Sequence, residues 1–97
     1  KDRDVIGVER VCWGTDYPHY EGTYPHSRLA IRHTFHDVDP AETRAMLGGN
    51  AAELYGFDIE KLAPLVDKIG PRPEEVRQPL GEDEFPENTV TMAFRRR

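Results

Sequence analysis

The residue types that could do chemistry are concentrated in residues 12–28, which read CWGTDYPHYEGTYPHSR. Asp16 stands two residues after Gly14, and His19 follows three residues after Asp16, so both side chains leave the same predicted loop. A carboxylate held at the tip of a strand can bind a metal ion or accept a proton. The histidine could share that site as a ligand, an acid or a substrate contact. The structural alternatives are an Asx turn for Asp16 and a solvent-exposed position for His19.

Asp16 and His19 do not complete a catalytic metal centre by themselves. Such centres usually take three or more protein ligands, so further ligands must come from elsewhere. Asn50 could reach a ligand, but we expect it to serve as the N-cap of a helix. Cys12 is the only cysteine, which excludes an internal disulfide and a cysteine-based zinc cage. Because its neighbours are apolar, we interpret Cys12 as a small buried hydrophobe and not as a reactive thiol.

The candidate residues need a scaffold, which we expect to begin with a strand at about 10–14. Residues 11–13 form a compact apolar run that ends at Gly14, as in the fully buried strands of parallel sheets. Residues 15–24 contain proline, glycine and many polar groups, which predicts a loop at the carboxyl end of this strand. Loops in that position carry the functional residues of α/β folds.

A helix is predicted next, at about 25–36, with an apolar face and a polar face. His26, His33 and His36 all project from its polar side. His33 and His36 are close enough to meet, but His26 and His33 are two turns, about 10 Å, apart and cannot chelate one ion. We therefore interpret the three histidines as part of a polar outer face and not as a metal site.

Two helices are predicted at about 40–47 and 50–55. The first has Asp39 as its N-cap and ends at Gly48 and Gly49. The second begins at its N-cap, Asn50, and ends before a further glycine.

A longer helix is predicted at about 59–69, after the N-cap Asp58. It carries an apolar stripe, and Pro64 should kink it or divide it in two. These elements make residues 1–70 one part of the chain. Residues 71–97 contain few apolar side chains and many charged residues and prolines, which predicts an extended or partly disordered tail that wraps or dangles, with at most one helical turn.

Two stretches, RVCWGTDYPHYEGTYPHSR and GGNAAELYGFD, resemble the C-terminal end of the amidohydrolase-2 family. This family comprises metal-dependent TIM-barrel hydrolases and decarboxylases of the amidohydrolase superfamily. Its last barrel strand ends in a G-[ST]-D-[YF]-P-H type motif, and the following helix leads to a G-N-A-x-x-[LF]-[YF] segment. The resemblance covers about residues 8–58 and implies an α/β fragment. That fragment would be the last strand and covering helices of a (β/α)8 TIM barrel, mostly helical in isolation, with an extended C-terminal tail.

The resemblance also implies roles for individual residues. Asp16 would be the strand-eight aspartate, which binds the metal or acts on metal-bound water or substrate, and His19 would be a substrate-binding residue near the pocket. Asn50 would fix the final helix against the barrel. The family's other ligands, an H-x-H or E-x-H pair on strand one and histidines on middle strands, have no counterpart in this chain. We therefore expect an incomplete site for a divalent metal, with zinc as first choice and manganese as second.

The leading functional hypothesis is the C-terminal portion of a metal-dependent amidohydrolase-like enzyme, which hydrolyses or nonoxidatively decarboxylates a small carboxylated molecule. The chain begins at Lys1 and, with 97 residues, is shorter than a barrel of about 200–250, so we interpret it as a piece of an active parent and as inactive alone. The alternative is a non-catalytic small helical interaction module, or a subunit that completes a barrel in trans. A strand with unpaired edges predicts a homo-oligomer or association with the rest of the barrel.

Charge and hydropathy exclude two classes of partner. Eighteen acidic residues outnumber thirteen basic ones, for a net charge of -5, and the only basic run is at residues 95–97. This balance excludes a nucleic-acid footprint. No apolar stretch reaches 18 residues and the N-terminus is too charged for a signal peptide, so we expect no membrane partner and a cytoplasmic location.

Overall fold

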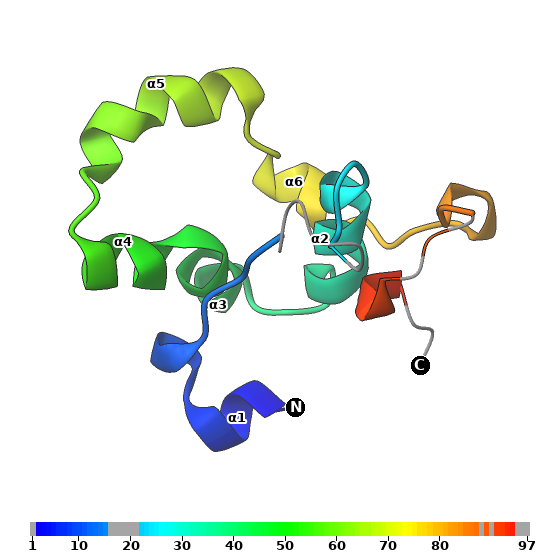
Figure 1. The fold of residues 1–97 in the computed structure, drawn as a ribbon, viewed down its shortest axis with the longest axis horizontal. Coiled ribbons are helices and arrows are strands. Elements are labelled where there is room, and N and C mark those ends of the chain that lie inside the picture. Colours follow the sequence, from blue (N-terminus) through cyan, green and yellow to red (C-terminus); the bar gives the residue numbers. More distant parts are fainter. Residues whose placement is uncertain (1, 16–21, 88, 90, 95–97) are drawn as a thin grey trace. The chain divides into compact units, whose positions relative to one another are not determined.

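The computed structural model describes residues 2–15, 22–87, 89 and 91–94. It divides the chain into two compact units, each built from two separate stretches of sequence (Figure 1). The first unit comprises residues 1–14 and 38–70, and the second comprises residues 15–37 and 71–97. The described residues are mostly helical, as expected, and no strand occurs among them.

The first unit is a succession of helical segments. They are α1 (Asp2–Ile6), the 3-10 turn η1 (Val8–Arg10), α3 (Pro40–Arg44), the π-helical turn η2 (Ala45–Gly49), α4 (Asn50–Tyr55) and α5 (Ile59–Ile69). Met46 and Ala52 are its buried apolar side chains, and Thr43 is buried beside them in sequence. Among all described residues, no helix is long and apolar enough to cross a membrane.

The predicted strand at about 10–14 is wrong for this structure. Val8–Arg10 form a helical turn, and only from Val11, with φ −102° and ψ 129°, is the backbone extended. A strand needs a neighbouring strand to accept its hydrogen bonds, and the described part of the chain offers none. Instead, the backbone N–H of Trp13 donates to the carbonyl of Met46 at 2.8 Å. Cys12, expected to be buried, is exposed for the same reason, because no sheet covers this segment.

The glycine pair that was predicted to end the helix at 40–47 does not end it. Asp39 caps α3 as expected, since its carboxylate accepts from the backbone N–H groups of Ala41 and Glu42. Gly49, however, has helical φ −59° and ψ −44°. Glycine permits a left-handed helix end but does not impose one, and the chain continues through η2 directly into α4.

The helix α5 begins and ends where the sequence predicts, but Pro64 does not divide it. The side chain of Asp58 accepts from the backbone N–H of Lys61 at 3.2 Å, which caps the first turn. The helix then continues past Pro64 to Ile69. Proline removes one backbone donor from a helix, and here the surrounding turns are exposed, so water can satisfy the carbonyl that loses its partner.

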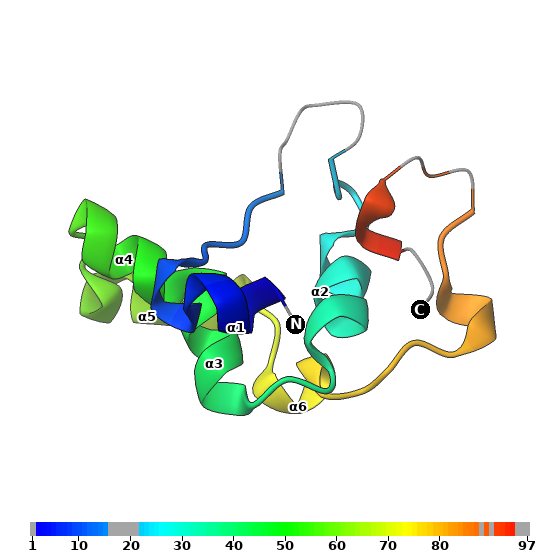
Figure 2. The same ribbon diagram turned by 90° about the horizontal axis from the view of Figure 1, so that it is seen from below.

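The second unit consists of one helix and the C-terminal segment that packs on it. They are α2 (Ser27–Phe35), α6 (Pro73–Val76) and the 3-10 turns η3 (Glu82–Glu84) and η4 (Met92–Phe94). Figures 1 and 2 both show α6 and η4 beside α2. The buried apolar side chains of this unit are Ala30, Ile31, Phe35, Val76 and Phe94. The tail therefore wraps around α2 and contributes to its core, and it is not simply extended.

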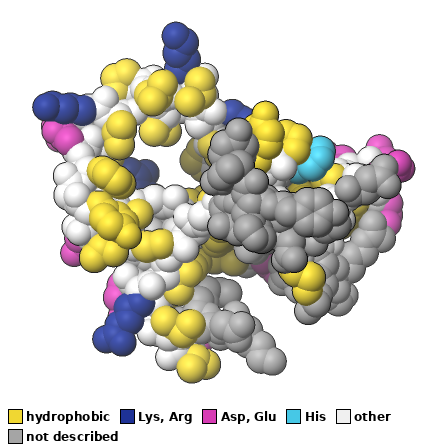
Figure 3. Space-filling view, in the orientation of Figure 1, with side chains coloured by type: hydrophobic (Ala, Val, Ile, Leu, Met, Phe, Trp, Pro, Cys, Tyr) yellow, Lys and Arg dark blue, Asp and Glu magenta, His cyan; other side chains and the backbone are white. Residues whose placement is uncertain are grey.

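Apolar side chains are exposed along α4 and α5 in the first unit. Yellow side chains gather over both helices in Figure 3. They belong to Leu54, Tyr55, Phe57, Ile59, Leu62, Leu65, Val66 and Ile69. The apolar stripe predicted for α5 is thus present, but the described part of this unit does not bury it.

Candidate functional site

Asp16 and His19 lie outside the described residues, so the candidate site is defined by the segments on either side of them. The structure describes Thr15 before these residues and Thr23 after them. The backbone N–H of Thr23 donates to the carbonyl of Thr15 at 3.0 Å. This bond joins the two ends of the segment that carries the predicted metal ligand and substrate contact.

Thr23 connects the hydrogen-bonded ends of this segment to the start of α2. Its side chain is buried and its Oγ1 lies 2.9 Å from Ser27 Oγ. Its carbonyl accepts a hydrogen bond from the backbone N–H of His26 at 2.7 Å. Thr23 therefore anchors the base of the segment to the first turn of the helix through both its backbone and its hydroxyl.

Asn50 positions the segment that precedes the candidate site, within the first unit. Its Nδ2 donates to the carbonyls of Val8 and Val11, both at 2.8 Å. Asn50 itself has helical backbone angles, φ −65° and ψ −42°, and no capping bond from its side chain. The predicted N-cap role is therefore wrong. Asn50 instead fixes α4 to the backbone of residues 8–11, because both amide hydrogens reach carbonyls that no strand partner occupies.

The three histidines of α2 do not form a metal site. His26 and His33 both lie against Phe94, with ring centroids 6.5 Å and 6.3 Å away, and His33 also meets Phe85 at 5.0 Å. His36 Nδ1 lies 3.1 Å from a backbone carbonyl of its own helix. All three were expected on a polar outer face, but aromatic rings of the C-terminal segment lie against His26 and His33.

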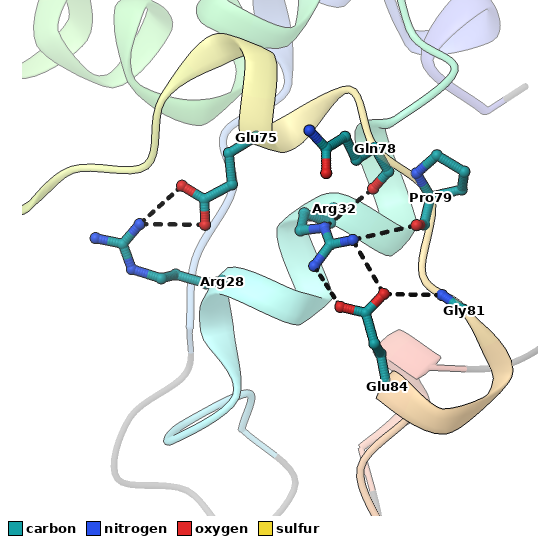
Figure 4. Close-up of polar contacts among 7 residues, drawn as sticks. All are labelled: Arg28, Arg32, Glu75, Gln78, Pro79, Gly81 and Glu84. Carbon is teal, nitrogen blue, oxygen red and sulfur yellow. Dashed lines mark hydrogen bonds and ion pairs between the residues drawn. The ribbon is translucent and has the colours of Figure 1, made fainter.

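Arg32 makes the densest set of polar contacts in the second unit (Figure 4). Its guanidinium binds both carboxylate oxygens of Glu84, at 2.8 Å and 3.2 Å, and the carbonyls of Gln78 and Pro79 at 3.0 Å and 3.1 Å. The hydrogen bonds from Arg32, and then that from the Gly81 N–H, hold the pKa of Glu84 below its ordinary value. The Arg32 side chain is only 13% exposed whereas that of Glu84 is 39% exposed, so this pair is a partly buried contact between α2 and η3.

A second arginine on the same helix makes a weaker contact. Arg28 Nη1 donates to Glu75 at 3.1 Å, and both side chains remain substantially exposed. The sequence analysis did not identify Arg28 and Arg32 as contact residues or find their partners. The available signal was charge: the arginines are four residues apart, one helical turn, and the C-terminal segment that follows is rich in glutamate.

The described residues do not hold a metal ion by themselves. Among them, no group of three or more His, Cys, Asp or Glu side chains is arranged for metal binding. Asp16 and His19 offer a carboxylate oxygen and an imidazole nitrogen, which are suitable zinc ligand types, but two donors are too few for a catalytic centre. The expectation of an incomplete site therefore stays a prediction.

Comparisons with known proteins identify the family but no individual relative. A family model described as amidohydrolase matches residues 3–57, which is more than half of the 97-residue chain. The match includes the candidate segment and Asn50, and it ends before α5 and the C-terminal segment. No curated protein and no solved structure matches the chain.

Proposed function

The chain belongs to the amidohydrolase family, and on this premise we propose that it is the C-terminal portion of a metal-dependent TIM-barrel enzyme. In this proposal residues 10–14 become the eighth barrel strand when neighbouring strands are present. The family match across residues 3–57 is the observation that carries the proposal. The extended backbone from Val11 onward is compatible with it.

Asp16 is the residue through which this chain would enter the chemistry. It would bind a divalent metal ion or act on metal-bound water or substrate, and His19 would contact the substrate. A divalent ion lowers the pKa of bound water or polarises a carbonyl. The hydrogen bond between Thr23 and Thr15 supports the proposal, because it restricts the ends of the segment that carries both residues.

The remaining metal ligands would come from the rest of the barrel. Zinc is our first choice and manganese the second, since imidazole and carboxylate donors suit both. The reaction would be hydrolysis or nonoxidative decarboxylation of a small carboxylated molecule. Both reactions need the same carboxylate beside the metal, so the residues of this chain favour neither.

Association with further polypeptide is part of the proposal. The exposed apolar side chains of α4 and α5, such as Leu54 and Leu65, supply a surface of the kind that packs against another element. The same surface favours a second candidate function, a non-catalytic helical module or a subunit that completes a barrel in trans. Only the non-catalytic module makes Asp16 dispensable for turnover, whereas a barrel needs Asp16 whether it is completed within one chain or in trans.

Metal binding by the 97-residue chain tests whether its metal site is incomplete, as we propose, or complete within the chain. We would measure zinc and manganese bound to the 97-residue chain and to Asp16→Asn, using equilibrium dialysis and elemental analysis. The proposal predicts no tight stoichiometric binding by either protein. Tight binding of one zinc ion by the chain, lost in Asp16→Asn, would show that the chain completes its own site and would refute the barrel proposal.

A further inference from the structure

We propose that the C-terminal segment, residues 71–87 and 91–94, is a clasp on α2. By holding this helix, it keeps Thr15 and Thr23, the two ends of the candidate segment, hydrogen-bonded to each other. Arg32 and Phe94 are its anchors. Both act through α2 and Thr23 and are therefore positioning residues. The clasp lies beyond the family-matched residues 3–57, so it is an addition to the part of the chain that the family shares.

The first anchor is ionic and involves the whole guanidinium group of Arg32. Its contacts with Glu84, Gln78 and Pro79 use both terminal nitrogens and Nε. A bidentate pair between arginine and carboxylate fixes direction as well as distance. Because the carbonyls of Gln78 and Pro79 are bound at the same time, this anchor orients the backbone of the clasp as well as one of its side chains.

The second anchor is aromatic and contacts both the N-cap of α2 and its second half. Phe94 is 8% exposed and its ring meets both His26 and His33, one edge-on and the other stacked. Ring pairs at such distances add stabilisation beyond the burial of their area. The first anchor, at Arg32, is next to His33 in sequence, and the contact of Phe94 with His26 extends the hold of the C-terminal segment to the start of the helix.

The aromatic anchor leads directly to the base of the candidate segment. His26 lies against Phe94 through its ring and donates its backbone N–H to the carbonyl of Thr23. Thr23 in turn donates its backbone N–H to Thr15 and lies within hydrogen-bonding distance of Ser27 through its hydroxyl. A continuous set of contacts therefore joins the clasp to the bond that closes the segment.

The length of α2 explains why this helix needs a clasp. It has nine residues, and isolated helices shorter than about 12–15 residues are marginal in water, so their stability comes from packing. The described contacts that bury its apolar face within this unit involve α6 and η4. Loss of the clasp should loosen the first turn of α2, and with it the hydrogen bonds of Thr23.

Amide hydrogen exchange measured by NMR on the 97-residue chain tests the proposal. The reporter is the Thr23 amide, and the reference is the Trp13 amide, which bonds within the first unit. We expect Arg32→Ala and Phe94→Ala each to speed Thr23 exchange on the order of tenfold without changing Trp13. Arg32→Lys, which keeps the charge but loses the bidentate fork, should restore part of the protection. Arg28→Ala, which removes the more exposed ion pair with Glu75 from the same helix, is the matched control and should change Thr23 exchange much less than Arg32→Ala.

Two results would overturn the clasp. One is unchanged Thr23 exchange in both Arg32→Ala and Phe94→Ala. The other is an equal rise at Thr23 and Trp13 in both variants, which would mean that these residues stabilise the whole chain and position nothing in particular. The importance of the clasp for chemistry rests on the proposed function, but the exchange measurement needs neither metal nor turnover. Failure of one proposal is therefore distinguishable from failure of the other.

Discussion

Replacement of Asn50 by alanine should destabilise the first unit by a predictable amount. Asn50 donates two side-chain hydrogen bonds, to Val8 and Val11, each 2.8 Å long. A net contribution of about 1 kcal/mol per hydrogen bond is typical. Alanine is a better helix former than asparagine by roughly 0.5 kcal/mol, which offsets part of the loss. The expected decrease in the free energy of unfolding is therefore about 1.5 kcal/mol.

The chain contains a natural reporter for this experiment, because Trp13 is its only tryptophan and follows the tethered residues directly. Its fluorescence in a urea titration, together with circular dichroism at 222 nm, gives the free energy of unfolding. Asn50→Asp is a sharper variant, since it removes both N–H donors and places a carboxylate against two carbonyl oxygens. Its loss should exceed that of Asn50→Ala. Glu53→Ala, at an exposed position of the same helix, should change stability by less than about 0.5 kcal/mol.

The contacts of Asn50 would have to be reconsidered if Asn50→Ala were as stable as the unmodified chain. A loss seen by circular dichroism without any change in the Trp13 transition would also count against the reasoning. In that case Asn50 would stabilise α4 without tethering residues 8–11.

The remaining predictions concern an ion pair and two glycines. The pKa of Glu84 is lowered, so its pair with Arg32 contributes stability above the ordinary value of 4.5, and this contribution is lost as pH falls through the lowered pKa. Glu84→Gln should therefore lower the melting temperature at pH 7, and its melting temperature should decrease less steeply below about pH 4.5 than that of the unmodified chain. An equal decrease in both proteins at acid pH would contradict the stabilising role of the ion pair. Gly56 has φ 73°, so Gly56→Ala should cost about 1 kcal/mol. Gly48→Ala, where an added methyl group meets nothing within 4 Å, should be neutral or stabilising in the same urea titration, and an equal cost at both positions would refute the conformational argument.

Local features of the sequence predict two helices of the first unit, α4 and α5, but not α1 or η1. The ranges 50–55 and 59–69 agree with the bounds of α4 and α5. Capping by Asp58 depends only on atoms within one helical turn, which is why a short stretch of sequence contains enough information. The helix predicted at 25–36 is shorter in the structure, because His26 and His36 flank it as caps.

Features that depend on distant partners were predicted poorly. The strand at about 10–14 and the burial of Cys12 both assume a neighbouring strand that the described residues do not supply. The C-terminal segment contacts α2 through pairs such as Arg32 and Glu84, which are 52 residues apart. Periodicity along the chain carries no information about such pairings. For the candidate site, Asn50 was expected to cap a helix and to fix it against the barrel, and the structure instead shows it bonded to the carbonyls of Val8 and Val11. The roles of Asp16 and His19 stay predictions.

The most direct test of the central claim is turnover by the proposed complete barrel enzyme, with and without Asp16. Release of carbon dioxide and release of acid, measured over a panel of small carboxylated substrates with zinc or manganese, would report decarboxylation and hydrolysis respectively. We predict that Asp16→Ala abolishes turnover while circular dichroism shows little change in folding. Retention of more than a few per cent of the activity by Asp16→Ala would contradict the claim that this chain supplies the carboxylate of the metal centre.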